Sequence, residues 1–329
     1  STRCCKDVAT VRKNEYVNLP VICLVGPTAS GKSGLAVRVC RRLYVDEHPA
    51  EIINTDSMVV YRGMDIGTAT PTLREQRTVV HHLVSILDVT VPSSLVLMQT
   101  LARDAVEDCL SRGVIPVLVG GSALYTKAII DEMSIPPTDP EVRARWQEKL
   151  DAEGPRVLHD ELARRDPKAA ESILPGNGRR IVRALEVIDL TGSFTATIPD
   201  GTLHWPKTVQ MGLELSRKDI DQRIADRVDQ MWAYGFVDEV RSLANVGLRE
   251  GLTASRALGY RQVLEYLNGD YDEDEARRRT IIGTRRFARK QLMWYRRDDR
   301  IEWFNALAPD LDDRVVARVL TALTTDEED

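Results

Sequence analysis

The chain has 329 residues, a formal net charge of −5, 43% hydrophobic residues and 29% charged residues. This composition is that of an ordinary globular protein and excludes a disordered or collagen-like chain, while the length allows one large domain or two smaller ones. No apolar run approaches the roughly 18 residues of a membrane span, so no membrane association is expected. A polar start without an apolar centre, and five cysteines without a Cys-X-X-Cys pair, predict a cytoplasmic protein.

The predicted elements begin as an alternation of strands and helices, after a leader (1–19) that we expect to be flexible. Short apolar runs rich in β-branched residues indicate buried strands, and amphipathic segments between them indicate helices. Strands are expected at Val21–Val25, Glu51–Asn54, Leu83–Leu87 and Val114–Val119. This alternation predicts an α/β fold, a parallel sheet flanked by helices.

A proline-dense segment, Met133–Pro140, marks a change of pattern. Only helices are expected from Asp139 to about Gly192, and strand character returns at Thr208–Leu215. We therefore expect an inserted all-helical module within an α/β core. The predicted boundaries are 20–134 and 206–325 for the core, 135–205 for the helical insertion domain and 326–329 for an acidic tail.

A phosphate-binding loop follows the first predicted strand. Its sequence, G-P-T-A-S-G-K-S, matches GxxxxGK[ST] at every defined position and precedes a predicted helix. Backbone N–H groups and the helix N-terminus would surround an anion, and the Ser33 hydroxyl could hold Mg²⁺. The loop predicts a di- or triphosphate ligand but does not specify the reaction. The residues expected to contact the phosphates are Gly26, Pro27, Thr28, Ala29, Ser30, Gly31, Lys32 and Ser33.

A carboxylate, Asp56, follows the second predicted strand. Because the carboxyl ends of parallel strands face the ligand crevice, Asp56 is expected opposite the phosphate-binding loop. There it could accept a proton from a nucleophile that attacks a phosphate-bearing substrate. With Ser57 beside it, Asp56 is equally consistent with a helix cap or a turn.

The segment Asn54–Pro71, N-T-D-S-M-V-V-Y-R-G-M-D-I-G-T-A-T-P, resembles the tRNA dimethylallyltransferases. The resemblance covers roughly residues 20 to 305, with the motifs in the family's order. Further matching stretches are His81–Leu83, Leu118–Tyr125, Asp139–Arg143, Gly178–Val187, Arg256–Arg261 and Arg286–Arg296. It implies a P-loop NTPase-like core with a tRNA-binding helical insertion. It also implies transfer of a dimethylallyl group from dimethylallyl diphosphate to the N6 amine of the tRNA adenosine 3′ to the anticodon.

The resemblance also implies roles for individual residues. The phosphate-binding loop, with Arg223 and Lys127, would hold the leaving diphosphate; Thr28 would hydrogen-bond its bridging oxygen, and Asp56 would take the amine proton. Mg²⁺ is the expected cofactor, and the expected partners of the monomer are the tRNA anticodon stem-loop and dimethylallyl diphosphate. The residues placed against tRNA are Asp56, Ser57, Met58, Val59, Ser122, Arg143, Arg179, Arg180, Arg183, Arg256, Gly259, Tyr260 and Arg261. Of these, Tyr260 and Arg261 could bind phosphate or stack on a splayed base.

One predicted helix carries a stripe of arginines that bears on tRNA binding. Four arginines fall on one line of a predicted helix near Glu273–Arg297, and this basic stripe either pairs with acidic residues or binds phosphate. They are Arg278, Arg285, Arg289 and Arg296.

The chain departs from the family's usual residues at four positions, which concern details of the pocket. They are Val59, Met98, Ala123 and Met293.

Three other functions share part of this pattern. A free-adenylate isopentenyltransferase would use the same loop and carboxylate, but has less need of an arginine-rich helical insertion. In a small-molecule P-loop kinase the insertion would be a lid over ATP. A non-enzymatic RNA-binding P-loop protein would leave Thr28 and Asp56 without a purpose.

Overall fold

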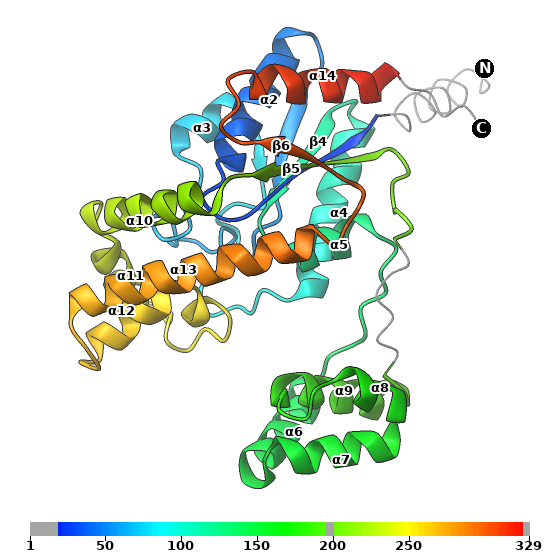
Figure 1. The fold of residues 1–329 in the computed structure, drawn as a ribbon, viewed down its shortest axis with the longest axis vertical. Coiled ribbons are helices and arrows are strands. Elements are labelled where there is room, and N and C mark those ends of the chain that lie inside the picture. Colours follow the sequence, from blue (N-terminus) through cyan, green and yellow to red (C-terminus); the bar gives the residue numbers. More distant parts are fainter. Residues whose placement is uncertain (1–18, 195–200, 325–329) are drawn as a thin grey trace, which may run out of the picture. The chain divides into compact units, whose positions relative to one another are not determined.

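The computed structural model describes residues 19–194 and 201–324 and divides the chain into two compact units (Figure 1). One unit is formed by Ser1–Asp131 together with Leu203–Asp329, and the other by Glu132–Thr202. Residues 1–18 of the predicted leader and the predicted acidic tail, 326–329, lie outside the described residues. Each unit has its own hydrophobic core.

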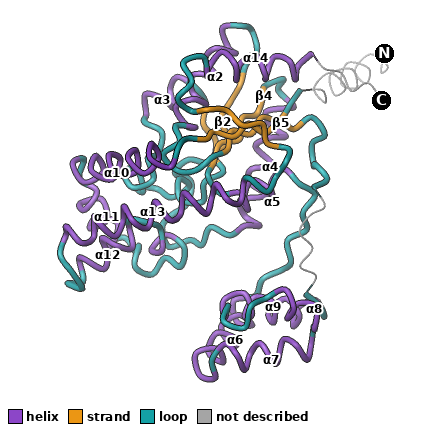
Figure 2. The backbone as a smooth tube through the Cα atoms, in the orientation of Figure 1, coloured by secondary structure: helices purple, strands orange, loops and turns teal. Residues whose placement is uncertain are grey.

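The first unit is built on a parallel sheet, whose strands are orange in Figure 2. The sheet has six strands in the order β3-β2-β4-β1-β5-β6. The strands are β1 (Val21–Val25), β2 (Ala50–Asn54), β3 (His81–His82), β4 (Ile115–Gly120), β5 (Thr208–Glu214) and β6 (Ile301–Asn305). The two central strands β1 and β4 are wholly buried, which explains their continuous apolar sequences. The predicted parallel α/β sheet is confirmed.

Helices cover both faces of this sheet. Alternate residues of the strands pack on α2 (Lys32–Val45) and α14 (Leu311–Thr324) on one face. The other face packs on α4 (Leu95–Ser111) and α5 (Ala123–Ile130). A further cluster around Tyr61, Phe236 and Tyr260 joins the segment after β2 to the helices beyond β5. These helices are α10 (Arg217–Ala233), α11 (Phe236–Ala244), α12 (Tyr260–Leu267) and α13 (Glu273–Tyr295), with the short η1 (Ala254–Arg256).

The predicted strand at Leu83–Leu87 is wrong. The strand β3 ends at His82, because Leu83 and Ser85 have φ values of 62° and 52°, which leave the extended conformation. Within this segment, Leu87 forms an isolated β-bridge with Tyr61. The edge strand β6 and the short helix α3 (Leu73–Thr78) were not predicted.

Only helices occur in the described part of the second unit. They are α6 (Pro140–Glu153), α7 (Pro155–Arg165), α8 (Pro167–Ser172) and α9 (Gly178–Thr191). Prolines open three of them, and the Asn177 side chain accepts a hydrogen bond from the Arg180 N–H at the start of α9. Their apolar faces meet in one core around Leu158, Leu162 and Leu185.

The helices were compared with the length and hydropathy that a membrane span requires. Among the described residues, none of the helices is both long enough and apolar enough to cross a bilayer.

Candidate active site

The phosphate-binding loop, Gly26–Ser33, connects the end of β1 to the start of α2. Gly26 has a φ of 146°, and a Cβ there would lie 2.9 Å from the carbonyl oxygen of Leu213, so glycine is needed. Gly31 has a φ of 94° and directly precedes α2, whose N-terminus has no side-chain cap. The first N–H groups of this helix are therefore available to an anion.

Three cationic side chains lie around this loop. The half-buried Lys32 donates from Nζ to the carbonyl oxygen of Pro27 at 3.3 Å. Arg223 approaches the carbonyl oxygens of Ala29 and Ser30 with its Nη1, at 3.5 and 3.4 Å. Arg227 donates from Nη1 to the hydroxyl oxygen of Thr28 at 3.2 Å. This concentration of positive charge suits a ligand with more than one phosphate.

Burial and neighbouring charges shift the pKa values of Lys32 and Arg227. Burial lowers the pKa of Lys32 to about 8; the carboxylate of Asp56 opposes this shift and the guanidinium of Arg227 adds to it. Burial also lowers the pKa of Arg227, again against the effect of Asp56. An anion bound in the loop would favour the charged forms of both groups.

Asp56 lies two residues beyond β2, where a local hydrogen-bond network fixes its backbone. Asn54 accepts from the N–H of Asp56 at 2.9 Å, and its amide donates to the carbonyl oxygens of Asp56 and Leu83 at 2.9 and 3.0 Å. The Oδ1 of Asp56 accepts from the N–H of Met58 at 2.8 Å, as expected of a turn residue. The second carboxylate oxygen forms no ion pair with any described residue, and it is available to a substrate.

The structure brings Asp56 and the phosphate-binding loop together, as the sequence predicts. The strands β1 and β2 both run parallel to β4, so the loop after β1 and Asp56 after β2 lie at the same edge of the sheet. The effect of Asp56 on the pKa values of Lys32 and Arg227 agrees with this placement. The arrangement offers an anion-binding loop and a carboxylate at the carboxyl ends of the strands. It suits a reaction in which a phosphate group leaves as a nucleophile loses a proton.

Two residues of the site were missed by the sequence analysis. Arg227 lies one helical turn beyond Arg223 on α10, and that spacing was the signal that could have found it. Gln291 of α13 is buried; its Oε1 accepts from the Thr28 N–H at 2.9 Å, and its Nε2 donates to the Gly121 carbonyl oxygen at 2.6 Å. Nothing in the sequence indicates this contact.

The remaining predicted ligands of the substrates come from α5, from the residue before it and from the segment after Asp56. Lys127 of α5 faces Asp298, with its Nζ 3.9 Å from a carboxylate oxygen, and its role toward diphosphate stays a prediction. Ser122 precedes α5 and is partly exposed beside Gly121. Of the residues after Asp56, Ser57 and Met58 are partly exposed. Val59 is buried, so its side chain is not open to tRNA.

One predicted stacking residue needs correction. Tyr260 is fully buried, packs edge-on against Phe236 and donates its hydroxyl to Glu239 at 2.6 Å. Its ring is therefore closed to a base, and it supports the turn at Gly259, which has a φ of 86°. Arg256 and Arg261 beside it are exposed.

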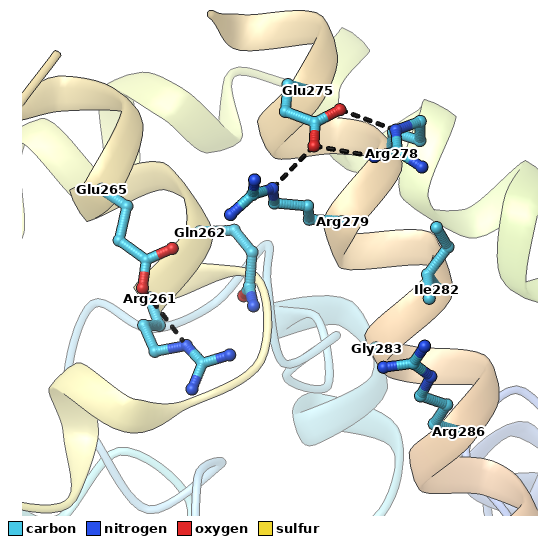
Figure 3. A pocket seen from close by; sticks show the side chains of 9 residues that line it. All are labelled: Arg261, Gln262, Glu265, Glu275, Arg278, Arg279, Ile282, Gly283 and Arg286. Carbon is cyan, nitrogen blue, oxygen red and sulfur yellow. Dashed lines mark hydrogen bonds and ion pairs between the residues drawn. The ribbon is translucent and has the colours of Figure 1, made fainter. Parts of the chain in front are cut away.

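A basic pocket of about 390 Å³ lies between α12 and α13 (Figure 3). Arg261 pairs with Glu265 at 3.6 Å, and Glu275 accepts from Arg278 and Arg279 at 2.6 and 2.7 Å. In contrast, Arg286 has no ion pair among the residues that the structure describes. The nine lining residues are Arg261, Gln262, Glu265, Glu275, Arg278, Arg279, Ile282, Gly283 and Arg286.

The predicted stripe on α13 is paired with acidic residues. Arg278 pairs with Glu275, Arg285 and Arg289 both contact Asp221, and Arg296 lies 3.6 Å from Glu214. The alternative of internal pairing thus describes this stripe.

In the second unit, the predicted tRNA arginines differ in their surroundings. The buried carboxylate of Glu186 pairs with Arg143 at 2.8 Å and with Arg183 at 2.9 Å, and accepts from the Asp139 N–H at 2.9 Å. Arg183 also donates to the carbonyl oxygens of Pro136 and Pro137. By contrast, Arg179 and Arg180 are exposed and have no acidic partner within the described chain.

Two places could be considered for a metal ion. Glu51, His82 and Cys109 have ligand atoms within 4.8 Å of one another. However, both oxygens of Glu51 already accept from Arg112, at 2.8 and 2.6 Å, and Arg112 is the main cause that lowers the pKa of Glu51 to about 2. At the phosphate-binding loop, Ser33 is the second residue of α2 and is exposed. A hydroxyl at this position suits a Mg²⁺ ion shared with a phosphate.

Known proteins are similar to this chain in both sequence and fold. The IPP transferase family profile matches residues 59–298. A tRNA dimethylallyltransferase from Thermobifida fusca is 54% identical over 300 residues, covering 91% of this chain and 94% of the relative. A crystal structure of the tRNA isopentenylpyrophosphate transferase from Bacillus halodurans is 36% identical. It covers 92% of this chain and 96% of its own, with a TM-score of 0.67.

A eukaryotic dimethylallyltransferase crystallised acting on tRNA supports the fold, with a TM-score of 0.77 at 23% identity. It covers 94% of this chain and 81% of that one. The expected P-loop NTPase-like fold and the family resemblance are both confirmed. With this identity over nearly the whole chain, the protein belongs to the tRNA dimethylallyltransferase family.

Proposed function

We propose that this protein transfers the dimethylallyl group of dimethylallyl diphosphate to the N6 amine of the tRNA adenosine immediately 3′ to the anticodon. The observation that carries the proposal is that the Asp56 carboxylate, just beyond β2, and the cationic phosphate-binding loop, just beyond β1, lie at the same edge of one parallel sheet. In the reaction, N6 attacks C1 of the donor and the C1–O bond breaks. Its electron pair leaves with diphosphate, and the amine gives up one proton.

Thr28 is the proposed contact to the departing oxygen. Its hydroxyl oxygen accepts from Arg227, and a guanidinium can only donate. The hydroxyl hydrogen is thus left for another acceptor, and the bridging oxygen gains negative charge as its bond to C1 breaks. A hydrogen bond that strengthens at that moment accelerates the step.

The diphosphate would be held by the N–H groups at the start of α2 together with Lys32, Arg223 and Arg227. We place Mg²⁺ at Ser33, where it would neutralise charge on the donor and on the product. Asp56 would accept the amine proton through the carboxylate oxygen that Met58 does not occupy.

For tRNA binding, we propose the arginines that lack acidic partners. Arg179 and Arg180 of the second unit would contact phosphates, with Arg256 and Arg286 of the first unit. A base amine can reach the site only after the adenosine leaves its stack, which costs a few kcal/mol. Contacts to the rest of the anticodon stem-loop would supply that energy. We expect the protein to act as a cytoplasmic monomer.

The test is to supply labelled dimethylallyl diphosphate with unmodified tRNA, an anticodon stem-loop, AMP or ATP. We expect label in tRNA and in the stem-loop, and AMP to be a very poor acceptor because it lacks the phosphate contacts. A kcat/KM for AMP within tenfold of the stem-loop value would instead support a free-adenylate isopentenyltransferase. Transfer of a labelled γ-phosphate from ATP, without prenyl transfer, would support a kinase.

A further inference from the structure

Gln291 occupies an unusual place in this site, because one buried side chain joins three segments. It comes from α13, near the end of that helix, and is 6% exposed. Its amide oxygen accepts from the Thr28 N–H in the phosphate-binding loop, and its amide nitrogen donates to the carbonyl oxygen of Gly121, between β4 and α5. The oxygen and the nitrogen of this one side-chain amide therefore each form a hydrogen bond with a backbone group.

The first consequence concerns Thr28, which is held from two directions. Gln291 fixes its backbone N–H at 2.9 Å, and Arg227 fixes its hydroxyl oxygen at 3.2 Å. The direction left to the hydroxyl hydrogen depends on both contacts. The N–H of Thr28 points to Gln291 in this structure, so the residue would meet the donor through its hydroxyl.

Gly121, which accepts the hydrogen bond from Gln291, leaves room for the amide because it has no side chain. A Cβ on Gly121 would lie 2.5 Å from the Nε2 of Gln291 and 3.5 Å from the Nζ of Lys32. Any larger residue at 121 would push the amide away from its two partners. One turn further along α13, the hydroxyl of Tyr295 donates to the carbonyl oxygen of Gly120 at 3.3 Å, but this second contact does not touch the loop.

We propose that Gln291 is a positioning residue for the transfer step, and that it sets the orientation of Thr28 toward the departing diphosphate. The inference rests on the proposed function. Only an amide fits the role fully, because it must accept from one N–H and donate to one carbonyl. A carboxylate of the same shape could still accept from Thr28, but it would repel the carbonyl oxygen of Gly121 and the diphosphate.

The experiment compares Gln291→Met and Gln291→Glu with wild type in full-length protein, using an anticodon stem-loop as acceptor. Because small misplacements of reacting groups cost up to about 10²-fold, we expect Gln291→Met to lower kcat on the order of 10–100-fold, with donor KM changed less than threefold. Gln291→Glu should lower kcat and also raise donor KM, because it places a negative charge beside Lys32.

The matched control is Tyr295→Phe, which removes the other hydrogen bond from α13 to the same pair of glycines. We expect its kcat to stay within threefold of wild type. If Tyr295→Phe lowers kcat as much as Gln291→Met, the effect is a loss of helix anchoring and the proposal is wrong.

A double-mutant cycle gives the decisive readout. Thr28→Val removes the hydroxyl and keeps the N–H, so adding Gln291→Met to it should cost less than threefold in kcat. Independent, multiplying effects would overturn the positioning role. Wild-type protein without transfer would overturn the proposed function and the inference together; an active wild type with an equally active Gln291→Met would overturn the inference alone.

Discussion

Replacing Asp56 by asparagine separates the two effects that its carboxylate has on the site. Asparagine keeps an oxygen for the Met58 N–H, so the turn after β2 and the thermal stability should be preserved. The group that accepts the amine proton is lost. Loss of a general base costs about 10²–10⁴ in rate, so we expect kcat to fall by that factor with tRNA affinity unchanged.

The second effect acts through Lys32, whose pKa is about 8 although Asp56 raises it. Without the carboxylate, the pKa of Lys32 falls further, and its charge is lost at lower pH. In wild type, kcat/KM for the donor should decline as pH rises through about 8, because this quantity reports the free enzyme. In Asp56→Asn the same decline should begin at a lower pH.

The assay is single-turnover transfer to an anticodon stem-loop, with kcat/KM for the donor measured from pH 6 to about pH 9. Asp65→Asn is the matched control, because Asp65 is an exposed carboxylate nine positions after Asp56 that forms no ion pair within the described chain. A turnover within threefold of wild type would contradict the role of Asp56 as base. An unchanged pH profile would contradict its electrostatic link to Lys32.

Two further predictions concern the second unit. Replacing Arg179 and Arg180 together by alanine should weaken tRNA binding and lower its salt slope by about two, one per lost phosphate contact. The control is Arg164→Ala, because Arg164 is exposed on the same unit but already paired with Glu161; an unchanged slope in the double variant would place Arg179 and Arg180 outside the interface. Glu186→Gln should destabilise residues 132–202 by about 2–3 kcal/mol, somewhat less than the roughly 3–5 kcal/mol for breaking a fully buried ion pair, because Arg143 and Arg183 are partly exposed. Burial opposes ionisation of Glu186, but hydrogen bonds from Thr138, Arg183 and the Asp139 N–H outweigh it and lower its pKa. This stabilisation should be present above the unfolded pKa of about 4.3 and lost as pH falls through the folded value, as hydrogen exchange would show, with Glu171→Gln as control.

Much of the fold could be predicted from local sequence. The buried strands β1 and β4 are short, continuous apolar runs, and the phosphate-binding loop marks the junction between β1 and α2. The segment after His82 could not be predicted, because Leu83 and Ser85 look like strand residues but have positive φ. That conformation is set by tertiary hydrogen bonds, such as the one from the Asn54 amide to the Leu83 carbonyl oxygen. No local pattern records such a contact.

The candidate site shows the same limit more strongly. The loop and Asp56 were predicted because each follows a strand, and the sheet brings the carboxyl ends of its strands together. Gln291 could not be predicted, because its partner Thr28 is 263 positions away in the chain. The family resemblance placed Tyr260 against tRNA, where it could bind phosphate or stack on a base. Its burial and its packing against Phe236 appear only in the structure, which shows that the ring is enclosed.

The arginines show why a count of charges is a poor guide to an RNA-binding surface. The chain is acidic overall, yet it has stretches dense in arginine. A guanidinium bound to a carboxylate gains less from a phosphate, because the existing pair must first separate. Arg285 and Arg289 share Asp221, and Arg143 shares Glu186 with Arg183, so these arginines already have partners within the fold. Affinity for phosphate should therefore follow the arginines without acidic partners rather than the longest basic run.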